Sequence, residues 1–141
     1  MTGLQAVTAV AKYINAATPS VFGSKAGKVF KYEKEKGYSG EYIAVNNLPF
    51  IHRDAVQVCT VNVNVHVPKQ PKTEQPDTKR LEQIVAAVVQ LFDTADGAFI
   101  DGAYYKYFSD SRPVLDNDNT YYCNVELDCT FNNLKRVTET T

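Results

Sequence analysis

The chain has 141 residues, of which 44% are hydrophobic and 22% charged, and its formal net charge is -1. These values exclude wholesale disorder and fit one globular domain over residues 1–141, with residues 1–2 and 135–141 expected to fray. They also argue against a fold that binds nucleic acid over its whole surface, because such domains are normally basic. They do not exclude binding by a local basic patch.

The first predicted element is an amphipathic helix over residues 3–17. Thr2 is placed to cap this helix and Pro19 to stop it. Its apolar residues recur at helical spacing: Leu4, Val7, Val10, Ala11 and Ile14. The N-terminal residues lack the basic and long apolar regions of a signal peptide. No apolar run approaches the roughly 20 residues of a membrane helix, so we expect neither a signal peptide nor a membrane span.

Residues 28–46 are predicted to form an extended β-hairpin. Val29–Tyr32 and Glu41–Val45 are its two arms, and Gly37 and Gly40 supply the positive φ that a turn at the tip requires. The tip is rich in charge and poor in apolar groups. We therefore expect it to stand in solvent or to reach another subunit.

A long strand is predicted from Val56 to Val67, with valines alternating with polar residues. The apolar phase slips near Cys59 and Thr60, which predicts a β-bulge there. The outer face of this strand is then polar but uncharged: Gln57, Asn62, Asn64 and His66. Exposed sheet edges of monomeric proteins often carry charged residues, so the absence of charge on this face permits a subunit contact. The alternative interpretation is a central strand whose outer face is simply hydrated.

A proline-bounded connector, residues 68–77, leads to a second helix over residues 78–92, capped by Asp77 or Thr78. Its inward stripe is clear: Leu81, Ile84, Val85, Val88, Leu91 and Phe92.

Two strands follow, one around Tyr104–Phe108 and one after an Asx-rich turn at residues 116–119. Alternate residues of the last strand are predicted to face the core: Tyr121, Cys123, Val125, Leu127, Cys129 and Phe131. The order of elements predicts an α+β fold, namely a single antiparallel or mixed β-sheet with two α-helices packed on one face and an extended β-hairpin.

The residue patterns contain no recognisable catalytic pair and no spaced set of metal ligands, so we expect no enzyme activity, no cofactor and no metal. His66 is expected to be solvated or at an interface. Cys123 and Cys129 would lie roughly 20 Å apart on one strand, too far to bond. We expect all three cysteines, including Cys59, to be reduced, which fits synthesis in a cytoplasm.

The whole layout resembles the tail terminator, or head–tail joining, proteins of long-tailed bacteriophages and related prophages. The resemblance covers residues 3–131 and rests on the order of elements, the valine-rich strand, the proline-bounded connector and the pattern Asp77, Leu81, Ile84 and Val88. It implies a structural virion protein made in the bacterial host cytoplasm. Such proteins form a ring, commonly a hexamer, that caps the tail tube and presents it to the head connector. The implied partners are further copies of the chain, the tail tube protein and the head connector protein, with DNA only in transit and no membrane.

In that family, contacts lie on long hairpins and sheet edges, which correspond here to residues 29–45 and 68–77. With the polar face of the long strand, these segments give the candidate subunit-interface residues: Lys31, Tyr32, Lys34, Tyr38, Tyr42, Asn62, Asn64, His66, Gln70 and Lys72.

A second hypothesis is a small nucleic-acid- or ligand-binding module that uses the lysine- and tyrosine-rich hairpin 28–45. Lysines among aromatic residues can follow a nucleic-acid strand. Glu33 and Glu35 dilute that charge, however, and a solvated hairpin explains the same residues.

Overall fold

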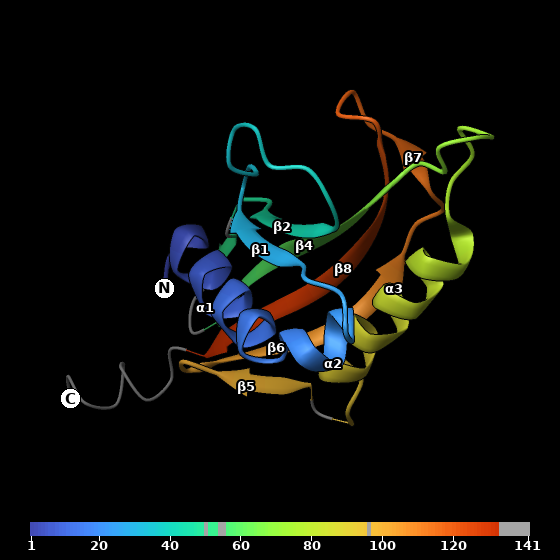
Figure 1. Ribbon diagram of the computed structural model, residues 1–141. Coiled ribbons are helices and arrows are strands. Elements are labelled where there is room, and N and C mark those ends of the chain that lie inside the picture. The colour runs from blue at the N-terminus through green and yellow to red at the C-terminus, as the bar shows by residue number, and fades with distance from the viewer. Residues whose placement is uncertain (50, 54–55, 96, 133–141) are drawn as a thin grey trace, which may run out of the picture.

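The computed structural model describes residues 1–49, 51–53, 56–95 and 97–132. These ranges contain three helices and a sheet of eight strands (Figure 1). The helices are α1 (Gly3–Ala16), α2 (Thr18–Phe22) and α3 (Thr78–Phe92). The strands are β1 (Lys28–Lys31), β2 (Tyr42–Asn47), β3 (Ile51–Arg53), β4 (Val56–Pro68), β5 (Ala98–Ile100), β6 (Ala103–Asp110), β7 (Val114–Leu115) and β8 (Thr120–Asn132).

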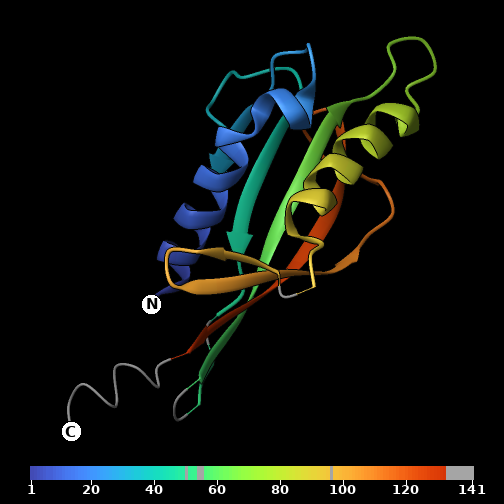
Figure 2. The same ribbon diagram turned by 90° about the horizontal axis from the view of Figure 1, so that it is seen from below.

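The sheet runs in the order β1-β2-β4-β8-β6-β5, with β3 beside β4 and β7 beside β8. All three helices lie on one side of it, as Figures 1 and 2 show. α1 packs on β1 and β2, whereas α3 packs on β4 and β8. The sheet also curls, so that α1 contacts β5 as well as β1. The predicted α+β class and the placement of helices on a single face are therefore present, but the described residues contain three helices and not the two predicted, because the short helix α2 follows α1.

The core lies between these helices and the sheet. Alternate residues of β4 and β8 point into it, and Val61, Val63, Val65, Val125 and Leu127 are fully buried. α1 contributes Val7, Val10 and Ile14, and α3 contributes Leu81, Ile84, Val88 and Phe92. Each such side chain stabilises the fold by about 1.5–3 kcal/mol relative to exposure.

Both long helices begin where the sequence predicts. Thr2 and Gln5 form a capping box at α1, and the Asp77 side chain accepts a hydrogen bond from the Arg80 backbone N–H at α3. α1 ends at Ala16, and Pro19 lies in the first turn of α2, where its fixed φ is already helical. Thr2 and Met1, which we expected to fray, both make contacts; the Met1 ammonium donates to Gln57 Oε1 at 3.4 Å. Residues 135–141 lie outside the described residues.

The extended hairpin predicted over residues 28–46 is wrong. β1 and β2 pair in parallel, with Lys28 opposite Tyr42 and Lys31 opposite Val45, so the chain crosses back through residues 32–41 between them. Tyr32 takes a positive φ of 67° as the chain leaves β1. The Arg80 guanidinium holds the far end of this crossover through two bonds to Glu41, at 2.7 and 2.8 Å. The sheet is consequently mixed.

The predicted bulge in β4 is also wrong. Its pairing with β8 runs in unbroken register from Val56 to Pro68, and Gln57 and Cys59 share the buried side with Val61. Val56 and Val58 therefore point to the opposite face of the sheet. The short strand β3 pairs with this part of β4. The register shift in this sheet lies in β6, between Tyr107 and Ser109.

The three cysteines are free thiols buried in the core. Burial raises the pKa of Cys59 to about 11. Burial is also the largest of the effects that raise the pKa of Cys129 to about 12. These thiols stay protonated at neutral pH and act as small apolar groups. The inward parity predicted for Cys123 and Cys129 is confirmed, and Cys59 joins them on the helix-covered side.

Candidate functional site

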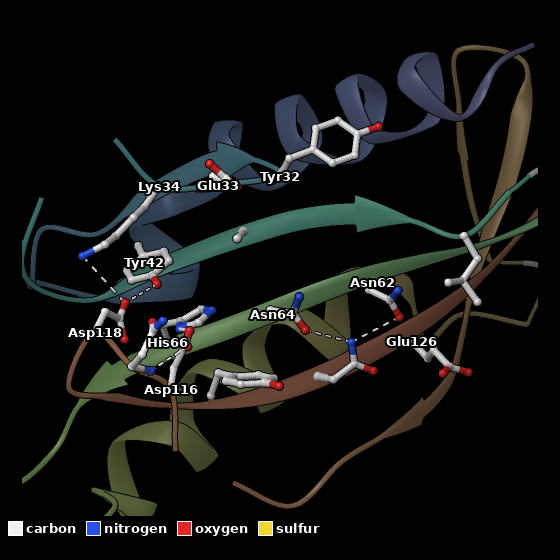
Figure 3. A pocket seen from close by; sticks show the side chains of 15 residues that line it. Tyr32, Glu33, Lys34, Tyr42, Asn62, Asn64, His66, Asp116, Asp118 and Glu126 are labelled. Atoms are coloured by element: carbon white, nitrogen blue, oxygen red, sulfur yellow. Dashed lines mark hydrogen bonds and ion pairs between the residues drawn. The ribbon is translucent and has the colours of Figure 1, made fainter. Parts of the chain in front are cut away.

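The side of the sheet away from the helices, called the open face below, carries the candidate site. Residues that are directly opposite on neighbouring strands share a face, so the register arranges the open face in rows. One row joins Tyr42, His66 and Tyr122; the next joins Ala44, Asn64 and Asn124; a third joins Asn46, Asn62 and Glu126. A groove of about 740 Å³ runs over these rows, between residues 32–34 on one side and 116–118 on the other (Figure 3).

His66 lies at the closed end of the groove, stacked between two tyrosines. Its ring centroid is 4.2 Å from that of Tyr42 and 5.0 Å from that of Tyr122. Only 6% of His66 is exposed, so the sequence interpretation of a solvated histidine does not hold for this chain. Burial lowers the pKa of His66, although the nearby carboxylates of Asp118 and Asp116 act in the opposite direction.

A chain of hydrogen bonds fixes the proton on His66. The Thr120 hydroxyl donates to Asp118 Oδ1 at 2.5 Å, so it accepts from His66 Nδ1 at 2.9 Å. The neutral imidazole therefore carries its proton on Nδ1. Tyr42 donates its hydroxyl to Asp118 Oδ2 at 2.5 Å, and Lys34 Nζ lies 3.7 Å from the same oxygen. Burial alone would raise the pKa of Asp118, but hydrogen bonds from Thr120 and Tyr42 lower it overall.

His66, Asp116 and Asp118 bring possible metal-ligand atoms within 4.8 Å of one another. In the hydrogen-bond arrangement above, His66 Nδ1 carries the proton donated to Thr120, so only Nε2 keeps a lone pair. The Lys34 ammonium already lies beside Asp118. We therefore interpret these side chains as a network that ties the crossover 32–41 to the β7–β8 turn.

An amide ladder crosses the middle of the groove. Asn62 donates to Asn46 at 2.9 Å, and Asn124 donates to both Asn62 and Asn64, at 3.2 and 2.8 Å (Figure 3). The ladder is neutral, so it orders the side chains of β2, β4 and β8 without creating charge. Beyond it lies Glu126, which is half-buried, and then Asp128, which is exposed.

The far end of the open face is apolar. The register aligns Ile51, Val58, Thr130, Tyr104 and Phe99 in one row across β3, β4, β8, β6 and β5. Ile51 is 50% exposed and Phe99 62%, and the Phe99 ring lies 4.8 Å from that of Tyr104. Such a row of exposed apolar groups is typical of a surface that contacts another protein.

The structure gathers most, but not all, of the predicted interface residues. Tyr32, Lys34, Tyr42, Asn62, Asn64 and His66 line the groove. Tyr38 packs beside them against Phe30 and Tyr42. The remaining three lie elsewhere: Lys31 is on the outer edge of β1, and Gln70 and Lys72 are exposed on the connector, which Gln70 and Glu74 close with a backbone hydrogen bond.

Sequence reasoning missed the half of the groove that β8 and its preceding turn supply: Asp116, Asp118, Tyr122, Asn124 and Glu126. The strict alternation of β8 did place Tyr122, Asn124 and Glu126 outward. Only the pairing of β8 with β4 shows that they share a surface with Asn62 and Asn64.

No protein-family model matches this chain, and no curated protein matches its sequence. Among solved structures, its fold is similar to that of a chain in the virion of a native gene transfer agent particle. The TM-score is 0.59 at 12% sequence identity, and the match covers 89% of this chain and 93% of that chain. At that identity the likeness shows a shared fold. Across the described residues, no helix combines the length and apolar character needed to cross a membrane.

Proposed function

We propose that this chain is a structural component of a virion, of the tail-terminator or head–tail joining kind. In this role copies of the chain form a closed ring, of six in our proposal, that caps the tail tube and joins it to the head connector. The chain is made in the cytoplasm of the bacterial host and ends in the virion tail. DNA passes through the ring, and the role is structural, without catalysis or a membrane.

The observation that carries this proposal is the end-to-end likeness in fold to a virion chain, 89% of this chain against 93% of the other. The independent resemblance of the sequence to tail terminators, in element order and helix pattern, supports the same class of protein.

The surface of the described residues suits assembly. The open face has no helix over it, and it ends in the exposed apolar row that includes Ile51, Tyr104 and Phe99. β1 and β5 end the strand order, so each presents one unpaired edge of backbone groups to a neighbour. Phe108, at the register shift of β6, adds a further exposed ring.

The structure weakens the nucleic-acid-binding alternative, although Lys28 and Lys31 remain exposed on β1. The lysines and tyrosines of residues 28–45 do not form one line on a hairpin, because β1 and β2 are parallel. Lys34 is paired with Asp118, and Tyr38 packs against Phe30 and Tyr42. The adjoining groove carries the carboxylates of Glu33, Asp116 and Glu126, which would repel phosphates.

Two measurements test the proposal. Purified protein is mixed with tail tubes and examined by electron microscopy, and its mass is measured by light scattering with and without tubes. We expect rings at tube ends and a mass that is a whole multiple of the 15.7 kDa chain. A chain that neither binds tubes nor forms a closed oligomer would contradict the proposal.

A further inference from the structure

Glu126 and Asp128 place two like charges on the open face of the same central strand. They are two residues apart on β8, so both point to the same side and their backbone positions lie about 7 Å apart. Within the described residues neither forms an ion pair, although Lys106 is opposite Asp128 in the register of β6. A cation supplied from outside the chain would relieve that repulsion.

The outer edge of β1 carries the opposite charge. Lys25, Lys28 and Lys31 are exposed along β1 and the loop before it, and in the described part of the chain none of them forms an ion pair. Lys28 and Lys31 are three residues apart, so their side chains leave β1 on opposite faces of the sheet and flank its edge from both sides. Lys28 Nζ lies 5.4 Å from the centre of the Tyr38 ring, on the open face, and Lys31 Nζ lies 3.4 Å from the Thr8 hydroxyl of α1. β1 ends the strand order, so no strand of this chain covers that edge.

Lysines on an edge strand often serve only to prevent strand pairing. This edge differs because the same chain also presents an acidic pair, Glu126 and Asp128, that forms no ion pair among the described residues. Ion pairs between such surfaces guide association and select the partner, because a misaligned approach would bring like charges together. The complementarity is between two different parts of one chain, which is what a head-to-tail contact between identical subunits requires.

We propose that the acidic pair Glu126 and Asp128 of one copy receives the basic β1 edge, Lys25, Lys28 and Lys31, of the next copy. This inference rests on the proposed ring and names its subunit contact. The edge and the open face are adjacent sides of the sheet and not opposite sides, as Figure 2 shows. A head-to-tail contact between adjacent sides turns each subunit relative to the last, and such contacts close into a ring when the turn has no rise along its axis, as the proposed ring requires.

The test is a charge exchange in the full-length chain. One variant carries Glu126→Lys and Asp128→Lys, a second carries Lys28→Glu and Lys31→Glu, and a third carries all four changes. Assembly is followed by light scattering against protein concentration, at low salt of about 50 mM and at high salt of about 500 mM. We expect each double variant to require at least about tenfold more protein to assemble, and the fourfold variant to assemble as the wild type does. The two double variants mixed together also restore assembly, since each then presents the surface that the other lacks.

Matched controls carry the same change of charge at exposed positions away from both surfaces. Lys79→Glu with Arg112→Glu matches the basic edge, and Glu82→Lys with Asp93→Lys matches the acidic pair. Circular dichroism and melting temperature verify that each variant is folded. Where a reversal does not fold, the milder Glu126→Gln with Asp128→Asn replaces it, with a smaller loss of assembly expected.

Three results would overturn the inference. In the first, both double variants assemble as the wild type does. In the second, the fourfold variant does not assemble although each double variant has lost assembly, and in the third, the wild-type chain stays monomeric at low salt and millimolar concentration. The proposed function fails separately, on the absence of any ring at tube ends. A ring that forms on tubes with every charge variant would keep the function and discard this contact.

Discussion

The two faces of strand β4 differ, although alternate residues of the same strand form them. Val61, Val63 and Val65 are fully buried under the helices, whereas Asn62 and Asn64 are half-buried on the open face. The first set is held by apolar packing alone, and the second by a ladder of amide hydrogen bonds. One face therefore determines whether the chain folds, and the other is free to specify what the folded chain contacts.

The largest effect expected from breaking this contrast is at Val63. We predict that Val63→Asp prevents folding, because an unpaired carboxylate would be buried among apolar groups. Asn64→Val, on the neighbouring residue of the opposite face, should change the free energy of unfolding by less than about 1.5 kcal/mol. Urea unfolding of both variants measures the difference. Similar losses at the two positions would contradict the division between the faces.

Next in size is Arg80, which joins α3 to the crossover. We predict that Arg80→Ala lowers the free energy of unfolding by about 3–5 kcal/mol, because Glu41, 8% exposed, is left buried without its partner. Lys69→Ala is the matched control, since it removes the exposed Lys69–Glu74 pair and should cost less than about 1 kcal/mol. Thermal denaturation of the two variants side by side gives the comparison. Equal effects would mean that Arg80 does not anchor the crossover.

The network at the closed end of the groove predicts two acid-dependent steps. The pKa of His66 is lowered from 6.5, chiefly by burial, so the stability that its neutral form contributes is fully present above pH 6.5 and is lost as pH falls from 6.5 through the lowered pKa of the folded state. Burial alone would raise the pKa of Asp118, but hydrogen bonding lowers it from 3.8. The contribution of the Asp118 carboxylate to the stability of the fold is therefore present above pH 3.8 and is lost as pH falls below that value.

Variants separate these steps. His66→Gln should remove the loss of stability that begins near pH 6.5, and Asp118→Asn should remove the step below pH 3.8. At pH 7 we expect Asp118→Asn to cost about 1.5–3 kcal/mol, because the carboxylate accepts hydrogen bonds from both Tyr42 and Thr120. Urea unfolding at several pH values measures this. A His66→Gln variant with the wild-type profile down to pH 5 would rule out the first assignment.

The smallest of these effects belongs to the amide ladder. We predict that Asn124→Ala costs about 1 kcal/mol, since it removes two side-chain hydrogen bonds in a groove that water can enter. Asn117→Ala, an exposed residue of the β7–β8 turn, should stay within about 0.5 kcal/mol of the wild type. Should the two variants unfold alike, the ladder would have no part in stability.

The sequence was sufficient where a pattern is local. The inward alternation of Cys123, Val125, Leu127 and Cys129, the cap Thr2 and the cap at Asp77 or Thr78 follow from local pattern, and the structure has the alternation and the caps Thr2 and Asp77. Of the stripe predicted for α3, Leu81, Ile84, Val88 and Phe92 are buried, whereas Val85 and Leu91 are half-buried. The direction of β1 could not be predicted, because Gly37 and Gly40 suit a hairpin tip as well as they suit a crossover. The Arg80–Glu41 contact, which holds the end of the crossover, joins residues far apart in the chain, so no local pattern shows it.

The candidate site shows the same limit. Val56 and Val58 were interpreted as core residues and therefore required a bulge, whereas they belong to the apolar end of the open face beside Ile51. His66 has a polar neighbourhood in sequence and an aromatic one in space, because Tyr42 and Tyr122 come from other strands. Residues on the open face could be assigned from parity, but their grouping needs the strand order.

Our central claim is that the open face is covered when copies of this chain assemble. Its most direct test is carboxyl labelling with a carbodiimide, followed by mass spectrometry, of the assembled and the unassembled protein. Glu82, exposed on α3, serves as the internal reference. We predict that Glu126 and Asp128 are modified in the unassembled chain and protected in the assembly, while Glu82 reacts equally in both. Equal modification of Glu126 and Asp128 in the two states would contradict the claim.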